Sequence, residues 1–529
     1  MSLDMLIRNA NIWDGSGAPA YRGHVGVRDG KIEFAGANFP DARAQVTIEG
    51  AGLHLAPGFI DVHAHYDIPV MEGDRVNFWK LSQGITAEVS GNCGISLAPV
   101  SARHLGLWRD FLKNSSLYPL PAELSEFTSY AAYFGKLERI KIPIRMAYLI
   151  GHSAVRAAVM GFENRNASAG ELNAMKDLVR EGMEAGAFGL SSGLFCAPGI
   201  FAPTDELVEL CKIVQEYGGV YATHTRSSGA VESNGEAIEI GKQTGVSVQI
   251  SHLKVSKSSR EGLAYEILRM IGEANNEGID VTADIYPYTS GCSALNFIIP
   301  PYYMQEGVAK MVEYLQNKEM RAKIALEIQD PENHNCGYDE TLIVAAPKTP
   351  QAVGKTVEEY AKIEGVEPSD ALFDILVENG GEGLAAWLTM REEDVEIFLR
   401  SPYVMFGTDG EAVPDGYGTH PRTLGAFPKI LGRYVREKGV ISCSEAIRKM
   451  TSLPAQKFGL KNKGLIRAGY DADLVLFDAE SIADHADFQN CRAHNEGIEA
   501  VVVGGRIVVS DNQYSGCTPG GLLRSGKRG

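Results

Sequence analysis

The sequence predicts an α/β protein: a (β/α)8 TIM-like barrel with a small β-sandwich domain built from both termini. In the middle of the chain, short apolar runs of strand length alternate with segments of helix length, a pattern typical of repeated βα units with parallel strands. Eight such runs can be counted, and eight parallel strands close a barrel. The predicted strands are residues 59–65, 84–91, 144–152, 187–192, 219–224, 247–252, 280–286 and 403–408.

The two ends of the chain have a different, β-rich texture. Near the N-terminus, Asp29-Gly30 separates two strand-like runs, which is typical of a hairpin. Similar apolar runs return near the C-terminus, for example Val501–Val509. Because neither end has enough strands to bury its own face, we expect the two ends to form one sandwich. The predicted domains are residues 1–56 with 464–529 for the sandwich, and residues 57–463 for the barrel.

Helix starts can also be predicted between the strands. Ser168 and Glu171 have the spacing of a capping box and predict a helix that runs to Glu184. Thr204 or Asp205 is expected to cap the next helix. More than a hundred residues, about 287–402, separate the seventh and eighth strands. An insertion of that length after a barrel strand is typical of a lid or a substrate-contacting subdomain.

Composition limits the function classes. The chain has 529 residues, of which 44% are hydrophobic, and a net charge of −17, so neither nucleic acid nor an anionic membrane surface is an expected partner. The N-terminus carries no pattern of a signal peptide and no long apolar run is present, so we expect a cytoplasmic protein. The eight cysteines are expected to stay reduced.

Metal-capable side chains follow the predicted strands, at the face where barrel enzymes carry their chemistry. These residues are His63, His65, Cys93, His152, His224, His252 and Asp409. His63 and His65 are two residues apart, so on a strand both point to one face. Imidazole, thiolate and carboxylate are the ligands of zinc-type sites, and their joint placement predicts a metal centre.

Each residue also has a structural interpretation that the pattern alone leaves open. Cys93 could be a small buried hydrophobe, although Gly91 and Gly94 leave its backbone room to curl around an ion. Asp409 could cap a turn. His152 could belong to a turn or to the start of a helix. The histidines that end strands could be hydrogen-bonded core residues.

In order and spacing, these motifs resemble the D-aminoacylase (N-acyl-D-amino-acid deacylase) branch of the amidohydrolase superfamily. The matching segments are His63-Ala64-His65, Gly91-Asn92-Cys93-Gly94, Thr223-His224-Thr225-Arg226, Ser251-His252-Leu253-Lys254, Asp284-Ile285-Tyr286-Pro287-Tyr288, Gly407-Thr408-Asp409-Gly410 and His420-Pro421-Arg422. The resemblance implies a tightly bound zinc on Cys93, His224 and His252. It also implies a weaker second metal position formed by His63, His65 and Asp409, with Cys93 shared.

The cysteine separates this branch from the hydantoinases and dihydroorotases, which usually bridge two metals with a carboxylated lysine from the fourth strand. Here the fourth strand, Phe188–Ser192, has no lysine. One departure from the family pattern follows that strand, because Phe195-Cys196 stands where the family often has a tyrosine after Gly-Leu-x.

The resemblance further implies that Lys254, Tyr286 and Arg422 hold the substrate's carboxylate or polarise its amide, and Ser293 is a further expected substrate contact. Asp409 is the predicted general acid and base, with His152 as a second catalytic candidate. The predicted function is zinc-dependent hydrolysis of a small-molecule N-acyl-D-amino acid. Neutral or apolar side chains are expected, because residues 293–301 offer no cation to pair with a second carboxylate.

Two alternatives remain at this point. The first is a cyclic amidohydrolase that opens a hydantoin, dihydropyrimidine or lactam, against which the missing fourth-strand lysine counts. The second is a metal-binding barrel without catalysis, acting as a scaffold, against which Asp409 and the carboxylate-binding cations count. The sequence sets neither the acyl group nor the oligomeric state.

Overall fold

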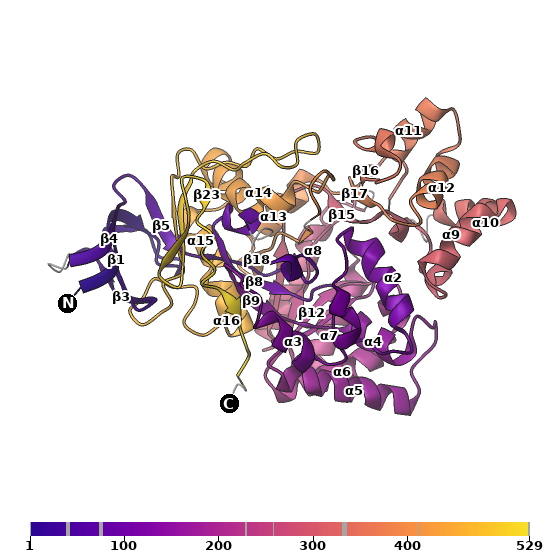
Figure 1. Cartoon of the computed structure of the whole chain (residues 1–529), viewed down its shortest axis with the longest axis horizontal. Coiled ribbons are helices and arrows are strands. Elements are labelled where there is room, and N and C mark those ends of the chain that lie inside the picture. Colours follow the sequence, from indigo (N-terminus) through magenta and orange to yellow (C-terminus); the bar gives the residue numbers. More distant parts are fainter. Residues whose placement is uncertain are drawn as a thin grey trace.

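The computed structural model describes residues 2–38, 43–73, 78–227, 230–257, 259–330, 336–411 and 413–526. It places a barrel at the centre of the molecule, a sheet made from both chain ends on one side, and an insertion on the other (Figure 1). The barrel strands are β6 (Phe59–Asp61), β8 (Ile85–Ser90), β9 (Arg145–Tyr148) with β10 (Ile150–Gly151), β11 (Gly189–Gly193), β12 (Val220–His224), β13 (Ser247–Ile250), β14 (Val281–Ile285) and β18 (Val404–Phe406). All eight predicted strands are present.

The barrel strands are parallel and pair in sequence order. β6 pairs with β8, β8 with β9, and β10 continues the series through β11, β12, β13 and β14 to β18. The ring closes between the eighth and first strands, because the Asp409 backbone N–H donates to the His63 carbonyl at 2.8 Å. Just beyond, β19 (Gly410–Glu411) pairs in parallel with β7 (Ala64–His65). The fold class predicted from the sequence is therefore confirmed.

Helices follow the strands and cover the outside of the barrel. They are α1 (Phe78–Leu81), α2 (Leu105–Ser116), α3 (Tyr130–Leu137), α4 (His152–Met160), α5 (Ala169–Glu184), α6 (Thr204–Glu216), α7 (Val231–Thr244), α8 (Leu263–Asn276), α13 (Glu392–Arg400), α14 (Arg422–Lys429), α15 (Cys443–Met450) and α16 (Ser452–Phe458). A π-helical stretch, Ile430–Glu437, continues α14. Val62, Val89 and Leu149, from the region of the first three barrel strands, belong to one buried apolar cluster.

The two predicted helix starts have different outcomes. Ser168 caps α5, and its capping box with Glu171 is present as predicted. The expectation for α6 is wrong: the helix begins at Thr204, the capping position is Pro203, and no side chain caps it. The Thr204 hydroxyl instead donates to Glu236 at 2.6 Å. Thr204 therefore makes a long-range contact with α7 in place of the local capping contact that was expected.

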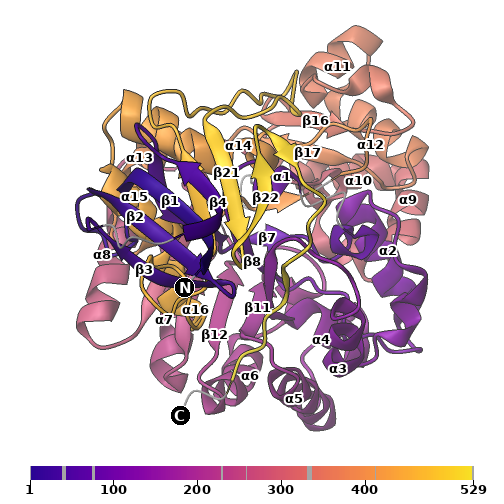
Figure 2. The ribbon, with the colours of Figure 1, turned by 60° about the vertical axis from the view of Figure 1, so that its left-hand side comes forward.

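Strands from both chain ends form a single sheet with the order β23-β22-β21-β20-β5-β1-β2-β3, and β4 pairs with β1. Figure 2 shows β1 to β4 from the N-terminal end (indigo) on the same side of the molecule as β21 and β22 from the C-terminal end (yellow). Their bounds are β1 (Ser2–Ile12), β2 (Tyr21–Arg28), β3 (Lys31–Gly36), β4 (Arg43–Glu49), β5 (His54–Pro57), β20 (Leu474–Phe477), β21 (Ile498–Val503), β22 (Arg506–Ser510) and β23 (Gln513–Tyr514). The ends meet where β5 pairs with both β1 and β20. Ile7, Val25, Leu474 and Val502 share one buried cluster, so residues from both ends fill the same core.

The long segment after β14 forms a small α/β unit that projects from the barrel (Figure 1). Its strands β15 (Gly291–Ala294), β16 (Thr341–Ala345) and β17 (Leu384–Trp387) pair antiparallel in the order β15-β17-β16. Its helices are α9 (Val308–Gln316), α10 (Lys318–Ile328), α11 (Val357–Glu364) and α12 (Pro368–Glu378). The last helix of the predicted range, α13, instead packs on β14 and β18 as part of the barrel wall.

Two further expectations can be compared with the structure. None of the helices in the described ranges is both long enough and apolar enough to cross a membrane. All eight cysteines are free.

β24 (Gly521–Leu522), close to the C-terminus, pairs in parallel with β9, so the end of the chain returns to the barrel.

The capping box of α5 gives a testable contribution to stability. Replacing Ser168 with Ala removes the acceptor for the Glu171 backbone N–H, so we expect a loss of about 1 kcal/mol. Hydrogen exchange at the first turn of α5, together with denaturant unfolding, measures this loss. Ser168→Asp is the control, because its carboxylate restores an acceptor. Equal exchange rates in Ser168→Ala and the parent protein would contradict the assignment.

Candidate metal centre and active site

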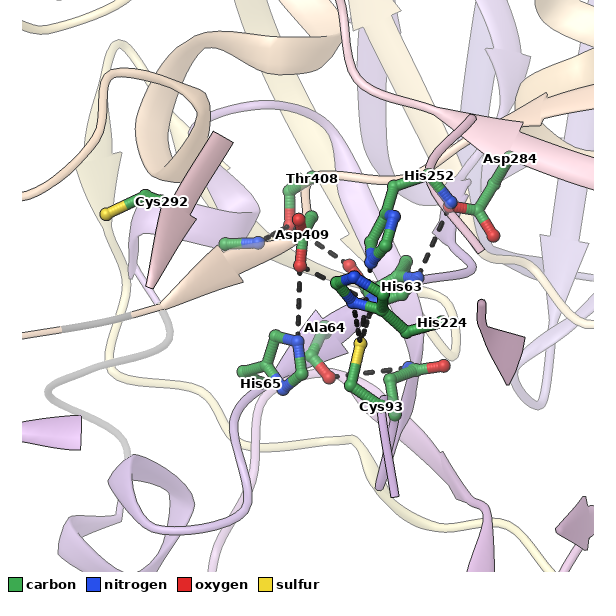
Figure 3. Close-up of polar contacts among 12 residues, drawn as sticks. His63, Ala64, His65, Cys93, His224, His252, Asp284, Cys292, Thr408 and Asp409 are labelled. Carbon is green, nitrogen blue, oxygen red and sulfur yellow. Dashed lines mark hydrogen bonds and ion pairs between the residues drawn. The ribbon is translucent and has the colours of Figure 1, made fainter. Parts of the chain in front are cut away.

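Six of the predicted metal-ligating residues converge at the carboxyl ends of the barrel strands (Figure 3). Cys93 lies at the centre of the group. Its Sγ is 3.4 Å from His63 Nε2, 3.6 Å from His224 Nδ1 and 3.5 Å from His252 Nε2. Three residues from the second, fifth and sixth strand ends therefore surround one point, together with the first histidine of the His-x-His pair.

Asp409 closes the other side of the cluster. Its Oδ1 lies 3.4 Å from His63 Nε2 and 3.2 Å from His65 Nε2. Three overlapping sets of donor atoms, each within 4.8 Å of one another, can hold an ion. They are His63, His65 and Cys93; Cys93, His224 and His252; and His63, His252 and Asp409. The structure thus brings together the six residues to which the resemblance assigns two metal positions.

Three of these residues have an unusual backbone conformation. Cys93, His252 and Asp409 have φ values of 51°, 32° and 46°. Non-glycine residues seldom adopt positive φ, and such conformations cluster at functional sites. On either side of Cys93, Gly91 and Gly94 also have positive φ, and a Cβ at Gly91 would lie 2.2 Å from the Leu149 carbonyl oxygen. The strand ends therefore turn sharply to aim their side chains at one point.

Buried polar residues that the sequence analysis did not assign hold the ligands in place. Asp284 Oδ1 lies 3.3 Å from His63 Nδ1 and accepts the His252 backbone N–H at 2.8 Å. Asp284 was visible in its motif, but its partners come from the first and sixth strands and depend on the closed barrel. The second imidazole nitrogen of His63 is thereby oriented by a carboxylate, an arrangement common for metal-ligating histidines.

A second support lies behind the first and eighth strands. Asp61 accepts hydrogen bonds from the backbone N–H groups of His63 at 3.2 Å and Thr408 at 2.8 Å. It also accepts hydrogen bonds from the Thr408 hydroxyl at 2.6 Å and from Lys80, which is fully buried. This network ties the residues next to both His63 and Asp409 to a single carboxylate.

The cluster strongly perturbs its own acid–base properties. Burial would raise the pKa of the Cys93 thiol, but His63 and contacts with His224 and His252 hold that pKa well below its ordinary value. Burial would likewise raise the pKa of Asp409, which Arg422 and the histidines beside it instead hold well below the usual range. A thiolate and a carboxylate are the forms in which these side chains bind metals.

The predicted substrate residues lie around one cavity of about 230 Å³ that opens over the cluster. Lys254, Ser293 and Arg422 line it. The Arg422 guanidinium contacts Asp409 Oδ2 at 2.7 Å and donates to the Cys292 carbonyl at 3.0 Å. The Ser293 hydroxyl oxygen accepts the indole N–H of Trp387 at 2.8 Å. Barrel and insertion therefore both contribute to the cavity wall.

Tyr286 packs against Arg422, one of the residues that line the cavity. It is 1% exposed and does not belong to the described cavity lining. The guanidinium carbon of Arg422 lies 4.6 Å from the centroid of the Tyr286 ring. The ring therefore packs against the face of the guanidinium and helps to hold it in place. Phe195, the departure from the family pattern, does line the cavity and stacks on His224 with ring centroids 3.9 Å apart.

His152 does not join the described residues of the cavity wall. It is the first residue of α4 and is fully buried, and its Nε2 lies 2.9 Å from Glu206 Oε1 on α6. Arg156 pairs with the other oxygen of the same carboxylate. This contact joins α4 to α6, so the geometry gives His152 a structural partner and offers no support for the predicted catalytic role.

Comparison with known proteins agrees with this geometry. A model of the amidohydrolase family matches residues 47–509, most of the chain. The chain belongs to the amidohydrolase family. A D-aminoacylase from Alcaligenes xylosoxydans xylosoxydans is 34% identical over 522 residues, covering 98% of this chain and 97% of the relative. An N-acyl-D-aspartate deacylase from the same organism is 34% identical over 526 residues, covering 99% and 95%.

A solved structure of this amidohydrolase branch has the same fold. The N-acyl-D-glutamate deacylase of Bordetella bronchiseptica, complexed with zinc and a phosphonate inhibitor that mimics the tetrahedral intermediate, superposes with a TM-score of 0.83. It is 30% identical and the match covers 99% of this chain and 100% of that chain. The resemblance to the D-aminoacylase branch is therefore confirmed.

The donor set of this chain fits a zinc ion. With Zn–S of about 2.3 Å and Zn–N of about 2.1 Å, a tetrahedral ion separates its sulfur and nitrogen ligands by about 3.6 Å. The distances from Cys93 Sγ to His224 and His252, 3.6 and 3.5 Å, match this separation. Thiolate ligands favour soft ions such as zinc, and imidazole is also a suitable ligand for zinc.

The central position of Cys93 leads to a test by metal binding. We expect Cys93→Ala to weaken zinc binding by at least about 100-fold, because even outer-shell changes cost 10- to 100-fold. Competition with a chelator of known affinity measures the dissociation constant. Cys211→Ala, which removes a buried thiol on α6 away from the cluster, serves as the matched control. Unchanged zinc affinity in a folded Cys93→Ala protein would exclude Cys93 as a ligand.

Proposed function

We propose that this protein hydrolyses the amide bond of N-acyl-D-amino acids in a zinc-dependent reaction, releasing a carboxylate and a free D-amino acid. The observation that carries the proposal is the convergence of Cys93, His224, His252 and Asp409 in one cavity that also contains Arg422. The relatives named a D-aminoacylase, a D-aspartate deacylase and a D-glutamate deacylase support the substrate class. The partner is accordingly a small molecule.

In this proposal Cys93, His224 and His252 hold the zinc, and His63, His65 and Asp409 provide the second, weaker position. Bound zinc supplies a Lewis acid and lowers the pKa of water to about 7, so that a nucleophile is available at neutral pH. The Asp409 carboxylate accepts a proton at one of its oxygens and later donates it to the departing amide nitrogen. Arg422 and the neighbouring histidines keep Asp409 ionised against the effect of burial, so its carboxylate is available as a proton acceptor.

Arg422 and Lys254 are proposed to hold the free α-carboxylate of the substrate. The planar guanidinium of Arg422 can make two parallel hydrogen bonds to a carboxylate, and Lys254 adds a point charge. The Tyr286 ring and the Cys292 carbonyl fix the plane of the arginine. The carboxylate would then lie next to Asp409, which places the adjacent amide nitrogen within reach of the proton donor.

The side chain of the substrate is proposed to be neutral or apolar. Phe195, Phe297, Ile298 and Ile328 contribute apolar surface to the cavity. Phe195 and Phe297 pack edge to face, with ring centroids 5.4 Å apart. Such a surface favours an apolar substituent, because a charged group placed against it would lose hydration without gaining a partner.

Opening of a cyclic amide is the second candidate. The cavity residues would serve that reaction too, but a carboxylate grip has no partner on an uncharged hydantoin or lactam. The fourth strand, which carries the bridging lysine in enzymes of that type, contains Ser191 and Ser192 instead. Linear N-acyl amino acids therefore fit the cavity better.

The proposal is tested first by a paired measurement on the whole protein. We expect at least one zinc per chain, and release of free amine from N-acetyl-D-amino acids but not from the matched N-acetyl-L-amino acids. Elemental analysis and amine-specific detection give the two readouts. Bound zinc without turnover of either enantiomer would contradict the substrate class, and preferential opening of hydantoins would support the second candidate.

Asp409 is tested by an isosteric substitution. Asp409→Asn removes the proton acceptor, so we expect turnover to fall by about 10²- to 10⁴-fold, the usual scale for a general acid or base. The zinc on Cys93, His224 and His252 should be retained, which elemental analysis checks. Turnover close to that of the parent protein would remove Asp409 from the mechanism.

A further inference from the structure

Glu411 is a cavity residue for which the proposed mechanism has no use. It is half-buried and lines the same cavity as Lys254 and Arg422. Glu411 on β19 is the strand partner of His65 on β7, so its side chain begins next to a residue that is expected to bind metal. This places a second acidic group of the cavity wall only two residues beyond Asp409.

The backbone of Glu411 is held on its other side as well. Its carbonyl oxygen accepts hydrogen bonds from the hydroxyls of Thr419 at 3.0 Å and Thr423 at 3.4 Å. With the strand pairing to β7, these contacts fix where the side chain starts. The backbone position of Glu411 in the cavity wall is therefore fixed on both sides.

The cations of the cavity do not compensate for an additional negative charge on a substrate. Arg226 contacts both oxygens of Glu236, at 3.1 and 2.9 Å, and also donates to the Ile200 and Ala202 carbonyls. Arg422 already contacts Asp409. Within the described lining, Lys254 is the cation that makes no ion pair with the protein.

The proposed α-carboxylate of the substrate would use Lys254 and Arg422. A second carboxylate, on a D-Glu or D-Asp side chain, would then enter a cavity with Glu411 and no remaining cation. Juxtaposed like charges cost several kcal/mol in a desolvated site and are a common means of excluding wrong ligands. The relatives named D-aspartate and D-glutamate deacylases act on such doubly charged substrates.

We propose that Glu411 is a specificity-determining residue that excludes N-acyl-D-amino acids with an acidic side chain and admits neutral ones. The inference rests on the proposed function and names the substrates that the same site selects. It attributes the exclusion of acidic substrates to the Glu411 carboxylate and not only to the apolar residues of the cavity wall.

The test compares N-acetyl-D-glutamine with N-acetyl-D-glutamate, two substrates of nearly equal shape that differ in charge. In the zinc-loaded parent protein we expect kcat/KM for the glutamine compound to be higher by at least about tenfold. In Glu411→Gln we expect the ratio to approach one, mainly through a gain on the glutamate compound. The assay is run at about pH 8.5, far above the ordinary pKa of about 4.3 for a glutamate side chain, so that the substrate carboxylates are ionised.

Glu216→Gln is the matched control, since it makes the same change on the exposed end of α6. Its glutamine-to-glutamate ratio should equal that of the parent protein. Elemental analysis of each variant checks that the zinc content equals that of the parent protein.

Three results would overturn the inference. A parent protein that hydrolyses both compounds equally well has no charge filter. A ratio that stays unchanged in an active Glu411→Gln protein means that another group excludes the acid. Loss of all turnover in Glu411→Gln with zinc retained would make Glu411 part of the chemistry. Absence of turnover of any N-acyl-D-amino acid by the parent protein would instead reject the proposed function, and the inference with it.

Discussion

The convergence of one thiol and three imidazoles on a single point is the constraint on which the rest of this structure depends. Cys93 Sγ lies within 3.4–3.6 Å of nitrogen atoms from the first, fifth and sixth strand ends. Parallel strands must close into a ring before these ends can meet. Burying a thiolate among histidines is costly without a cation, so the cluster is stable in its charged form only with a metal or protons to balance it.

The surrounding fold stabilises this costly arrangement. Cys93, His252 and Asp409 all adopt positive φ, a conformation that non-glycine residues keep only where neighbouring structure enforces it. The enforcing contacts come from Asp284, which orients His63 and the His252 backbone, and from Asp61, which ties the first strand to the eighth. These carboxylates are themselves buried, and each is satisfied by several donors.

Much of this could be predicted from the sequence, because strands of a barrel have local signatures and their ends carry the chemistry. The eight strands and the seven metal-capable residues that follow them needed only periodicity and position, whereas the set of six expected ligands came from the family resemblance. Contacts between distant segments could not be predicted. Thr204 bonds Glu236 instead of capping its own helix, and His152 pairs with Glu206 from another helix. Asp284 was visible in its motif, but its partners depend on the closed ring.

Overall sequence similarity cannot decide which substrate side chain this protein accepts, because different parts of the chain build the metal cluster and the rest of the cavity wall. The strand ends supply the metal cluster, whereas the insertion and the segment after the eighth strand supply most of the remaining cavity wall. The chain is 34% identical both to a D-aminoacylase and to a D-aspartate deacylase, so whole-chain identity does not separate the two. A few charges in the wall must do so. In a desolvated cavity a single carboxylate shifts the energy of a second one by more than many apolar contacts. Under the proposed function, the charge balance around the substrate sets side-chain specificity in this protein, while the metal cluster sets the reaction.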